Sequence, residues 1–167
     1  MALGPLEGAR VVDLYAGSGA LAIEALSRGA VWADAVDSER HAREALRRNL
    51  EELDLLDRVR IWPLRLPAGL ARLGETLARA TLVLADPPYG GADARALLER
   101  LGKPGVLASG ARVVLETHAK DVVPEVEGAL ARTSQRRYGE TVVHVYTATM
   151  ARGGPASAAP RAESGGS

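Results

Sequence analysis

The fold of this chain is decided by the stretch Arg10-Val11-Val12-Asp13-Leu14-Tyr15-Ala16-Gly17-Ser18-Gly19-Ala20-Leu21. An apolar run of strand character leads into a loop with two glycines, and a helical pattern follows at once. Gly17 and Gly19 let the backbone bend tightly and approach a ligand without a Cβ in the way. The helix start beyond them offers free N–H groups. This strand, loop and helix predict the first unit of a doubly wound α/β fold, with a ligand at the loop.

Short apolar runs continue to alternate with helical patterns along the chain, which indicates βαβ units and a mostly parallel sheet. In the second expected helix, Ala42, Leu46, Leu50 and Leu53 share one face. The expected helices are Ala20 to Arg28, Glu39 to Leu53, Ala68 to Ala78 and Ala92 to Leu101. The seven expected strands are Arg10 to Leu14, Ala33 to Asp37, Val59 to Pro63, Thr81 to Asp86, Arg112 to Glu116, and a late antiparallel pair at Ala131 to Tyr138 and Thr141 to Thr149.

Composition indicates one domain without cysteine chemistry. The 167 residues are 47% hydrophobic, which is enough for one core and too little chain for two ordinary domains. Lys plus Arg and Asp plus Glu both number 21, so the net charge is zero and any contact with RNA must be local. The absence of Cys excludes a disulfide framework, a thiolate metal site and a Cys nucleophile.

The two ends of the chain carry predictions of their own. From Arg152 the composition collapses to Gly, Pro, Ala and Ser, so we predict a domain over 1–150 and a disordered tail over 151–167. The N-terminus lacks the basic start and apolar core of a signal peptide, and no apolar run reaches transmembrane length. Both features are typical of a cytoplasmic protein.

A second motif, Asp86-Pro87-Pro88-Tyr89, indicates chemistry on an amino group. It follows the apolar run Leu82 to Ala85, at the point where a buried strand opens into a site. The two prolines fix φ and remove two N–H donors, which leaves backbone carbonyls free to accept hydrogen bonds. Asp86 can then accept one N–H of a nucleobase amine and the Pro87 carbonyl the other, while Tyr89 stacks on the extruded base.

The ligand of the glycine loop is indicated by two carboxylates. Asp37 ends the second strand, where a carboxylate can take both hydroxyls of a ribose. Gly17 to Ala22 also fits a G-x-G-x-x-A fingerprint, so NAD remains possible on this evidence. Asp13 distinguishes NAD from a ligand that carries an ammonium group. An acidic group beside the glycines repels the pyrophosphate of NAD and attracts an ammonium. S-adenosylmethionine carries an ammonium and a sulfonium.

Three blocks in this order resemble the bacterial 16S ribosomal RNA guanine-N2 methyltransferases, a class I S-adenosylmethionine-dependent family. They are Asp13 to Leu21, Glu24 to Ala30 and Asp86 to Tyr89, and Tyr138-Gly139-Glu140-Thr141 is similar to that family's closing hairpin motif. The resemblance implies a Rossmann-like class I methyltransferase fold with helices on both faces of the sheet. It also implies that Asp13, Gly17 and Gly19 hold the methionine moiety. The implied cofactor site comprises Asp13, Tyr15, Ala16, Gly17, Ser18, Gly19, Asp37 and Ser38, and the implied catalytic residues are Asp86, Pro87, Pro88 and Tyr89.

The implied activity is methyl transfer from S-adenosylmethionine to the N2 amine of a guanine in 16S rRNA, without a metal. The partner is naked RNA or the small ribosomal subunit particle, and the enzyme is expected to be a monomer. Asp-Pro-Pro-Tyr also serves adenine and cytosine amines in RNA or DNA, so the motif does not name the base. A truncated non-catalytic paralogue that binds cofactor or RNA is a further alternative, whereas the second motif disfavours an NAD oxidoreductase.

Two departures from the family pattern carry expectations. Relatives begin with a longer N-terminal segment that helps to cover the cofactor and contact RNA, and this chain begins close to its first strand. We expect either that the start is truncated, with weaker cofactor binding, or that RNA recognition and cofactor closure are supplied otherwise. Relatives also often place an Asp or Asn after the strand Val59 to Pro63, near the adenine amine. Leu64, Arg65 and Leu66 stand there instead, so we expect either that adenine is held only by apolar and backbone contacts or that Arg65 simply points to solvent.

The other polar residues are ranked by what surrounds them in the sequence. Arg132, Arg136 and Arg137 near the late hairpin are the best candidates for RNA phosphate contact. Glu116 ends a strand near the crevice, where it orients a group or caps a turn. His118 is expected to be a solvated loop histidine, because guanine N2 loses its proton only after methyl transfer and needs no strong base. The sequence shows no partner for Trp32, His41, Asn49, Trp62 or His144.

Overall fold

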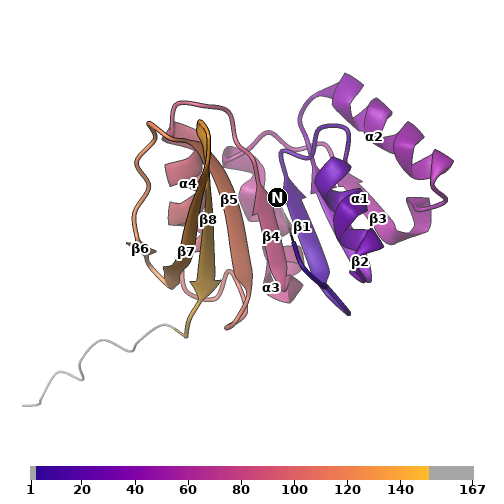
Figure 1. The fold of residues 1–167 in the computed structure, drawn as a ribbon. Coiled ribbons are helices and arrows are strands. Elements are labelled where there is room, and N and C mark those ends of the chain that lie inside the picture. The colour runs from indigo at the N-terminus through magenta and orange to yellow at the C-terminus, as the bar shows by residue number, and fades with distance from the viewer. Residues whose placement is uncertain (1–2, 151–167) are drawn as a thin grey trace, which may run out of the picture.

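The strands form one sheet in the order β3-β2-β1-β4-β5-β8-β7-β6 (Figure 1). The computed structural model describes residues 3–150, so the tail predicted at 151–167 lies outside the described residues. The first five strands are parallel, and β8 pairs with β5 in the antiparallel sense, followed by β7 and β6. The parallel strands are β1 (Arg10–Leu14), β2 (Trp32–Val36), β3 (Val59–Trp62), β4 (Leu82–Ala85) and β5 (Arg112–His118), and the antiparallel ones are β6 (Val126–Glu127), β7 (Leu130–Tyr138) and β8 (Thr141–Ala148).

The predicted α/β architecture is confirmed, with eight strands in the described chain rather than seven. The extra strand, β6, is two residues long and adds to the edge of the hairpin by pairing with Ala131 and Leu130. Such a short segment has no apolar alternation of its own, so it is recognised only through its partner strand. The strand order reverses between β1 and β4, which creates a crevice at the carboxyl ends of these two strands.

Helices cover both faces of the sheet, as expected. One face packs against α1 (Ala20–Ser27) and α2 (Arg40–Glu52), which bury Ala22, Ala25, Leu46 and Leu50 on the strands. The other face packs against the 3-10 helix η2 (Ala68–Leu73), α3 (Gly74–Arg79) and α4 (Ala92–Leu101), with buried leucines throughout. A further 3-10 turn, η1 (Leu56–Arg58), leads into β3.

Two helix expectations need correction. The helix predicted over 68–78 is divided into η2 and α3, because the backbone tightens to a 3-10 turn before Gly74. Leu53, predicted to share the buried face of α2, is 54% exposed because the helix ends one residue earlier and Leu53 forms its C-cap. Within residues 3–150, no helix is long and apolar enough to cross a bilayer.

Buried polar residues brace the sheet in a way that the sequence did not indicate. Asp34 on β2 accepts hydrogen bonds from the indoles of Trp32 (2.9 Å) and Trp62 (2.8 Å), so both rings gain partners. His144 on β8 lies within hydrogen-bond distance of Thr117 on β5, with 3.0 Å between Nε2 and Oγ1. The bonds to Trp62 and between His144 and Thr117 connect neighbouring strands, whereas the bond to Trp32 lies within β2.

Candidate active site

Four carboxylates gather at the carboxyl edge of the parallel strands. Asp13 belongs to β1, Asp37 follows β2, Asp86 follows β4 and Glu116 lies in β5. The negative charges of Asp86 and Asp37 both raise the pKa of Asp13, and that of Asp86 raises the pKa of Glu116, so the groups share one electrostatic environment. Such a concentration of negative charge favours a cationic ligand.

Asp13 is the most constrained of these groups. It is 1% exposed, and neither carboxylate oxygen has a hydrogen-bond partner among residues 3–150. Burial raises the pKa of Asp13 to about 7, and the charges of Asp86 and Asp37 add to the shift, while the nearby Ala22 amide opposes it without reaching hydrogen-bond geometry. A buried carboxylate without a partner is costly, so Asp13 fits a ligand that brings an ammonium group to it.

The glycine loop is held in place by residues from the second βα unit. Gly17 donates its backbone N–H to Asp37 Oδ2 at 2.9 Å, and Glu39 donates its N–H to Asp37 Oδ1 at 2.8 Å. Asn49 on α2 donates to the Ser18 carbonyl at 2.9 Å, which gives this side chain a partner that the sequence did not show. Each oxygen of Asp37 keeps a lone pair for a hydroxyl of the ligand, so the same carboxylate can brace the loop and bind a ribose.

Gly19 allows the loop to pack closely against α2. Its φ is +90°, and a Cβ placed there would lie 2.1 Å from Cδ1 of the buried Leu46. No other residue type fits this position without moving the leucine. The spacing of the two glycines therefore reflects both the turn and the contact with α2.

Tyr15 connects the glycine loop to the start of α4. Its φ is +61°, unusual for a residue with a side chain, and its hydroxyl donates to Asp93 Oδ2 at 3.0 Å. Burial raises the pKa of Tyr15, and the bond to Asp93 adds to the shift. Because α4 directly follows the Asp-Pro-Pro-Tyr loop, this bond links the two predicted halves of the site.

The Asp-Pro-Pro-Tyr loop projects from the carboxyl end of β4. Pro87 is buried and anchors the loop, whereas Tyr89 is 77% exposed. Partial burial raises the pKa of the Asp86 carboxyl group, although the residue as a whole is exposed. Burial is the cause of this shift, and no hydrogen bond from the described residues contributes to it. This carboxylate and the Tyr89 ring are thus available to a group that enters from solvent.

Glu116 and His118 stand beside this loop on β5. Burial raises the pKa of Glu116, and the charge of Asp86 raises it further. The expectation of a solvated His118 without a partner is wrong. Its ring is 25% exposed, bonds to Glu140 and the Lys120 amide, and packs edge-on against Tyr89. The signal was missed because Tyr89 and Glu140 lie far away in the sequence.

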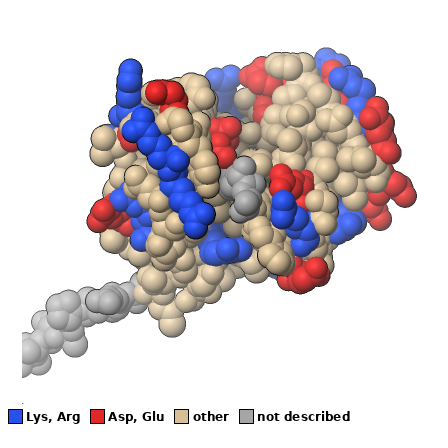
Figure 2. Space-filling view, viewed as in Figure 1, with Lys and Arg blue, Asp and Glu red and all other residues tan. Residues whose placement is uncertain are grey.

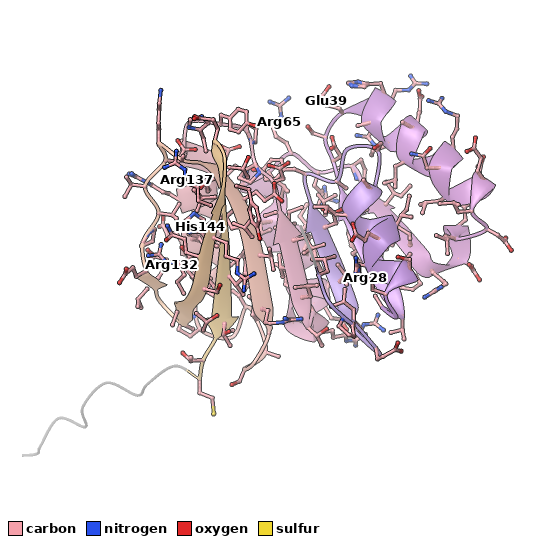
Figure 3. The ribbon with its side chains drawn as sticks, in the orientation of Figure 1. Arg28, Glu39, Arg65, Arg132, Arg137 and His144 are labelled. Carbon is pink, nitrogen blue, oxygen red and sulfur yellow. The ribbon has the colours of Figure 1, made fainter. Side chains whose placement is uncertain are left out.

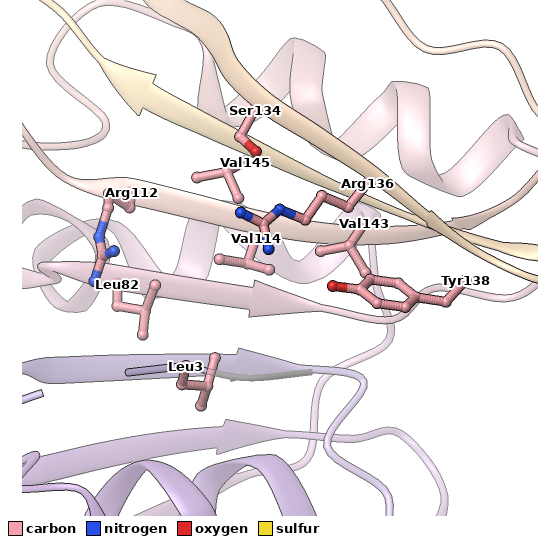
Figure 4. Close-up of a pocket in the computed structure, with 9 residues that line it drawn as sticks. All are labelled: Leu3, Leu82, Arg112, Val114, Ser134, Arg136, Tyr138, Val143 and Val145. Carbon is pink, nitrogen blue, oxygen red and sulfur yellow. The ribbon is translucent and has the colours of Figure 1, made fainter. Parts of the chain in front are cut away.

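The three candidate arginines of the hairpin do not form one cluster. Arg132 pairs with Glu125 at 2.9 Å and is 16% exposed, while Arg137 is exposed and donates to the Gly139 carbonyl. Arg136 lines a cavity of about 250 Å³ on the opposite face of the sheet, together with Arg112 and Tyr138 (Figure 4). The cause is a register shift between Arg132 and Ser134, which changes the side-chain alternation. Figure 2 shows basic side chains along this hairpin.

The segment after β3 behaves as expected. Leu64 and Leu66 are buried in the core, and Arg65 is exposed at the carboxyl edge (Figure 3). Their alternation leaves the apolar side chains facing inward, so the expectation of a solvent-facing Arg65 is confirmed, and contact of this segment with adenine stays a prediction. Within residues 3–150, no group of three or more His, Asp or Glu side chains is arranged to hold a metal ion.

Comparison with known proteins gives a consistent result. The family model described as "Conserved hypothetical protein 95" matches residues 2–147. The chain is 32% identical over 145 residues to the putative rRNA methyltransferase YlbH of Bacillus subtilis, covering 86% of this chain and 79% of that protein. It is 30% identical over 142 residues to ribosomal RNA small subunit methyltransferase D of Escherichia coli, covering 83% and 68%.

The fold also matches a solved structure of this class. An RNA methyltransferase from Salinibacter ruber, crystallised with S-adenosyl-L-homocysteine, superposes with a TM-score of 0.66 over 86% of this chain and 84% of that one. The identity is 18%, so this likeness concerns the fold. The Rossmann-like fold expected from the motifs is thereby confirmed.

Proposed function

Because the chain belongs to the family described as Conserved hypothetical protein 95, which includes the small subunit methyltransferase D, we propose that it methylates the N2 amine of a guanine in 16S rRNA. One observation carries this proposal. The Asp-Pro-Pro-Tyr loop presents an available carboxylate and an exposed aromatic ring beside a buried, unpartnered Asp13 at the same edge of the sheet. That arrangement supports the proposal of an amine-binding group next to a site for a cationic cofactor.

The enzyme class and cofactor that the motifs indicated are confirmed: the chain is an S-adenosylmethionine-dependent RNA methyltransferase. The residues present fit this cofactor. Asp13 suits its ammonium, the Gly17 to Gly19 backbone allows close approach, and Asp37 suits its ribose. When bound, S-adenosylmethionine would supply an electrophilic methyl group: the amine nitrogen would form a bond to the methyl carbon as the carbon–sulfur bond breaks, and S-adenosylhomocysteine would leave.

The protein contributes mainly positioning to this reaction. Asp86 and the Pro87 carbonyl accept the two N–H groups of the target amine, so that its lone pair faces the methyl group. Tyr89 stacks on the base and keeps it in the plane that these acceptors require. The proton is lost after the methyl group has been transferred, when the nitrogen has become acidic, so no strong base is needed next to it.

The choice of 16S rRNA rests on the family and on the two relatives named for rRNA. Either naked RNA or an assembling small subunit particle is the substrate, and both are made in the bacterial cytoplasm, where we place the enzyme as a monomer. The hairpin arginines are proposed to contact RNA phosphates, with Arg136 and Arg137 the better candidates because Glu125 already neutralises Arg132.

The test is methyl transfer from labelled S-adenosylmethionine to small subunit particles and to naked 16S RNA, both from cells that lack the modification. Nucleoside analysis should recover the label as N2-methylguanosine. Label in an adenosine or cytidine derivative would show that the target is the amine of adenine or cytosine and would contradict the proposed guanine. Label in ribosomal protein, or binding of S-adenosylhomocysteine without any transfer, would overturn it.

A further inference from the structure

His118 joins the Asp-Pro-Pro-Tyr loop to the tip of the β7–β8 hairpin. Its ring centroid lies 5.6 Å from that of Tyr89, with the planes at 82°, which is an edge-to-face aromatic pair. Its Nε2 lies 3.0 Å from Glu140 Oε2 at the hairpin tip. The backbone repeats this connection, because Ala119 donates its N–H to the Glu140 carbonyl at 2.7 Å. Segments that are distant in sequence therefore meet at one imidazole.

The hydrogen bonds of His118 determine where its ring proton lies. The Lys120 backbone N–H donates to Nδ1 at 3.1 Å, so Nδ1 acts as an acceptor and carries no proton. The proton of the neutral ring is then on Nε2, where it donates to the Glu140 carboxylate. Both ring nitrogens are engaged, and the ring plane is fixed from two sides.

The Tyr89 ring has little else to hold it. It is 77% exposed and is followed by Gly90 (φ +110°) and Gly91 (φ +74°), whose backbone conformations residues with a Cβ rarely adopt. The loop does approach the residues after β5, since a Cβ on Gly91 would lie 3.4 Å from the Asp121 Cβ. Asp121 in turn accepts the His118 backbone N–H at 3.2 Å. The imidazole is thus a supported neighbour for an aromatic ring that is mostly exposed to solvent.

We propose that His118 is a positioning residue for methyl transfer, which holds Tyr89 at the angle needed to stack on the target base and is itself held by Glu140 of the hairpin. The inference rests on the proposed function, because it assigns Tyr89 the base-stacking role. It adds the hairpin tip to the substrate site.

The test uses His118→Asn, because an Asn side chain can accept the N–H two residues ahead and preserve the turn but offers no ring to Tyr89. We expect kcat/KM for RNA to fall about three- to tenfold, the range that an aromatic pair is worth, with an unchanged Kd for S-adenosylhomocysteine. The same substitution at the exposed His41 on α2 is the matched control and should have no effect. Glu140→Ala should reproduce part of the loss, and Glu140→Gln, which keeps an acceptor, should lose less.

The decisive comparison is a double-mutant cycle with Tyr89→Leu. If His118 acts through Tyr89, His118→Asn adds no further loss in the Tyr89→Leu background. Losses that simply multiply would overturn this inference while leaving the proposed function intact. In the absence of RNA, NMR should show His118 protonated on Nε2, and the Tyr89 ring resonances should shift in His118→Asn. A wild-type protein with these NMR features but without methyl transfer to any nucleobase would overturn the proposed function instead.

Discussion

Asp37 Oδ2 accepts a hydrogen bond of 2.9 Å from the Gly17 backbone N–H, so the end of β2 directly supports the glycine loop that follows β1. The other oxygen of Asp37 accepts the Glu39 N–H and holds the start of α2. One carboxylate therefore supports both the glycine loop and the start of α2. A residue in this position affects the ligand both by contact and by organising the loop.

Asp37→Ala should weaken binding of S-adenosylhomocysteine by roughly 1.5–3 kcal/mol, the range for hydrogen bonds to a charged group. Isothermal calorimetry measures this directly. Asp57→Ala, which removes an exposed carboxylate in η1, is the control for the loss of one negative charge. An unchanged dissociation constant in Asp37→Ala would place Asp37 outside the site.

Binding of S-adenosylhomocysteine should weaken as the pH falls below about 7. Burial raises the pKa of Asp13 to about 7, and only the ionised carboxylate attracts the ligand's ammonium. The Kd should therefore rise by up to about tenfold per pH unit below that value, and binding should release protons near it. Calorimetry in buffers of different ionisation enthalpy reports this release. The Asp13→Asn variant should bind S-adenosylhomocysteine weakly, with a Kd that does not change with pH. In the wild type, NAD should not raise the melting temperature.

The same carboxylate should make stability depend on pH in the ligand-free protein. Burial raises the pKa of Asp13 in the folded state to about 7, whereas in the unfolded state the carboxyl group has its ordinary pKa of 3.8. As the pH rises from 3.8 to about 7, the unfolded state loses the proton first, so the free energy of unfolding falls over this range and is highest below it. Relative to Asp13→Asn, the wild type should lose up to about 1.4 kcal/mol per pH unit across this window. Denaturant unfolding of both proteins across this range gives the difference. A constant difference would show that Asp13 ionises normally.

Asp86→Ala should reduce turnover by about 10²-fold or more while leaving S-adenosylhomocysteine binding nearly unchanged, because the carboxylate orients the amine rather than the cofactor. Asp86→Asn keeps one acceptor oxygen and should be impaired yet measurably active. Single-turnover methylation at saturating S-adenosylmethionine separates these effects from binding. Turnover of Asp86→Ala at the wild-type rate would remove Asp86 from the reaction.

Gly19→Ala should destabilise the protein by about 1–3 kcal/mol, because the new methyl group would overlap the buried Leu46 and φ is +90°. Gly74→Ala provides the matched control, since Gly74 has a helical φ of −49° and nothing within 4 Å of its Cβ position. That control should be neutral or slightly stabilising. Urea midpoints of the two variants test the contrast.

The helices and strands whose bounds were predicted best are those with clear start or stop residues in the adjacent sequence. The bounds of β1 are as expected, because the apolar run ends directly at the glycine loop, and those of α4 agree because Gly91 and Gly102 flank it. The glycine loop and the Asp-Pro-Pro-Tyr motif could be predicted to lie at one edge of the sheet from their positions after two strands. The carboxyl ends of parallel strands meet at the same edge. The division at Gly74 and the exposure of Leu53 were missed because helix ends depend on small local differences in backbone energy.

By itself, the sequence determined the alternation of strands and helices, the glycine loop, the Asp-Pro-Pro-Tyr motif and the family. These features depend on residues that lie within a few positions of one another, because side-chain spacing and backbone preferences act over that range. Tertiary structure alone decided that Tyr15 bonds to Asp93, that His118 joins Tyr89 to Glu140, and that a register shift separates Arg132 from Arg136. Such contacts depend on which strands become neighbours and in what register, which is settled only when the whole chain packs.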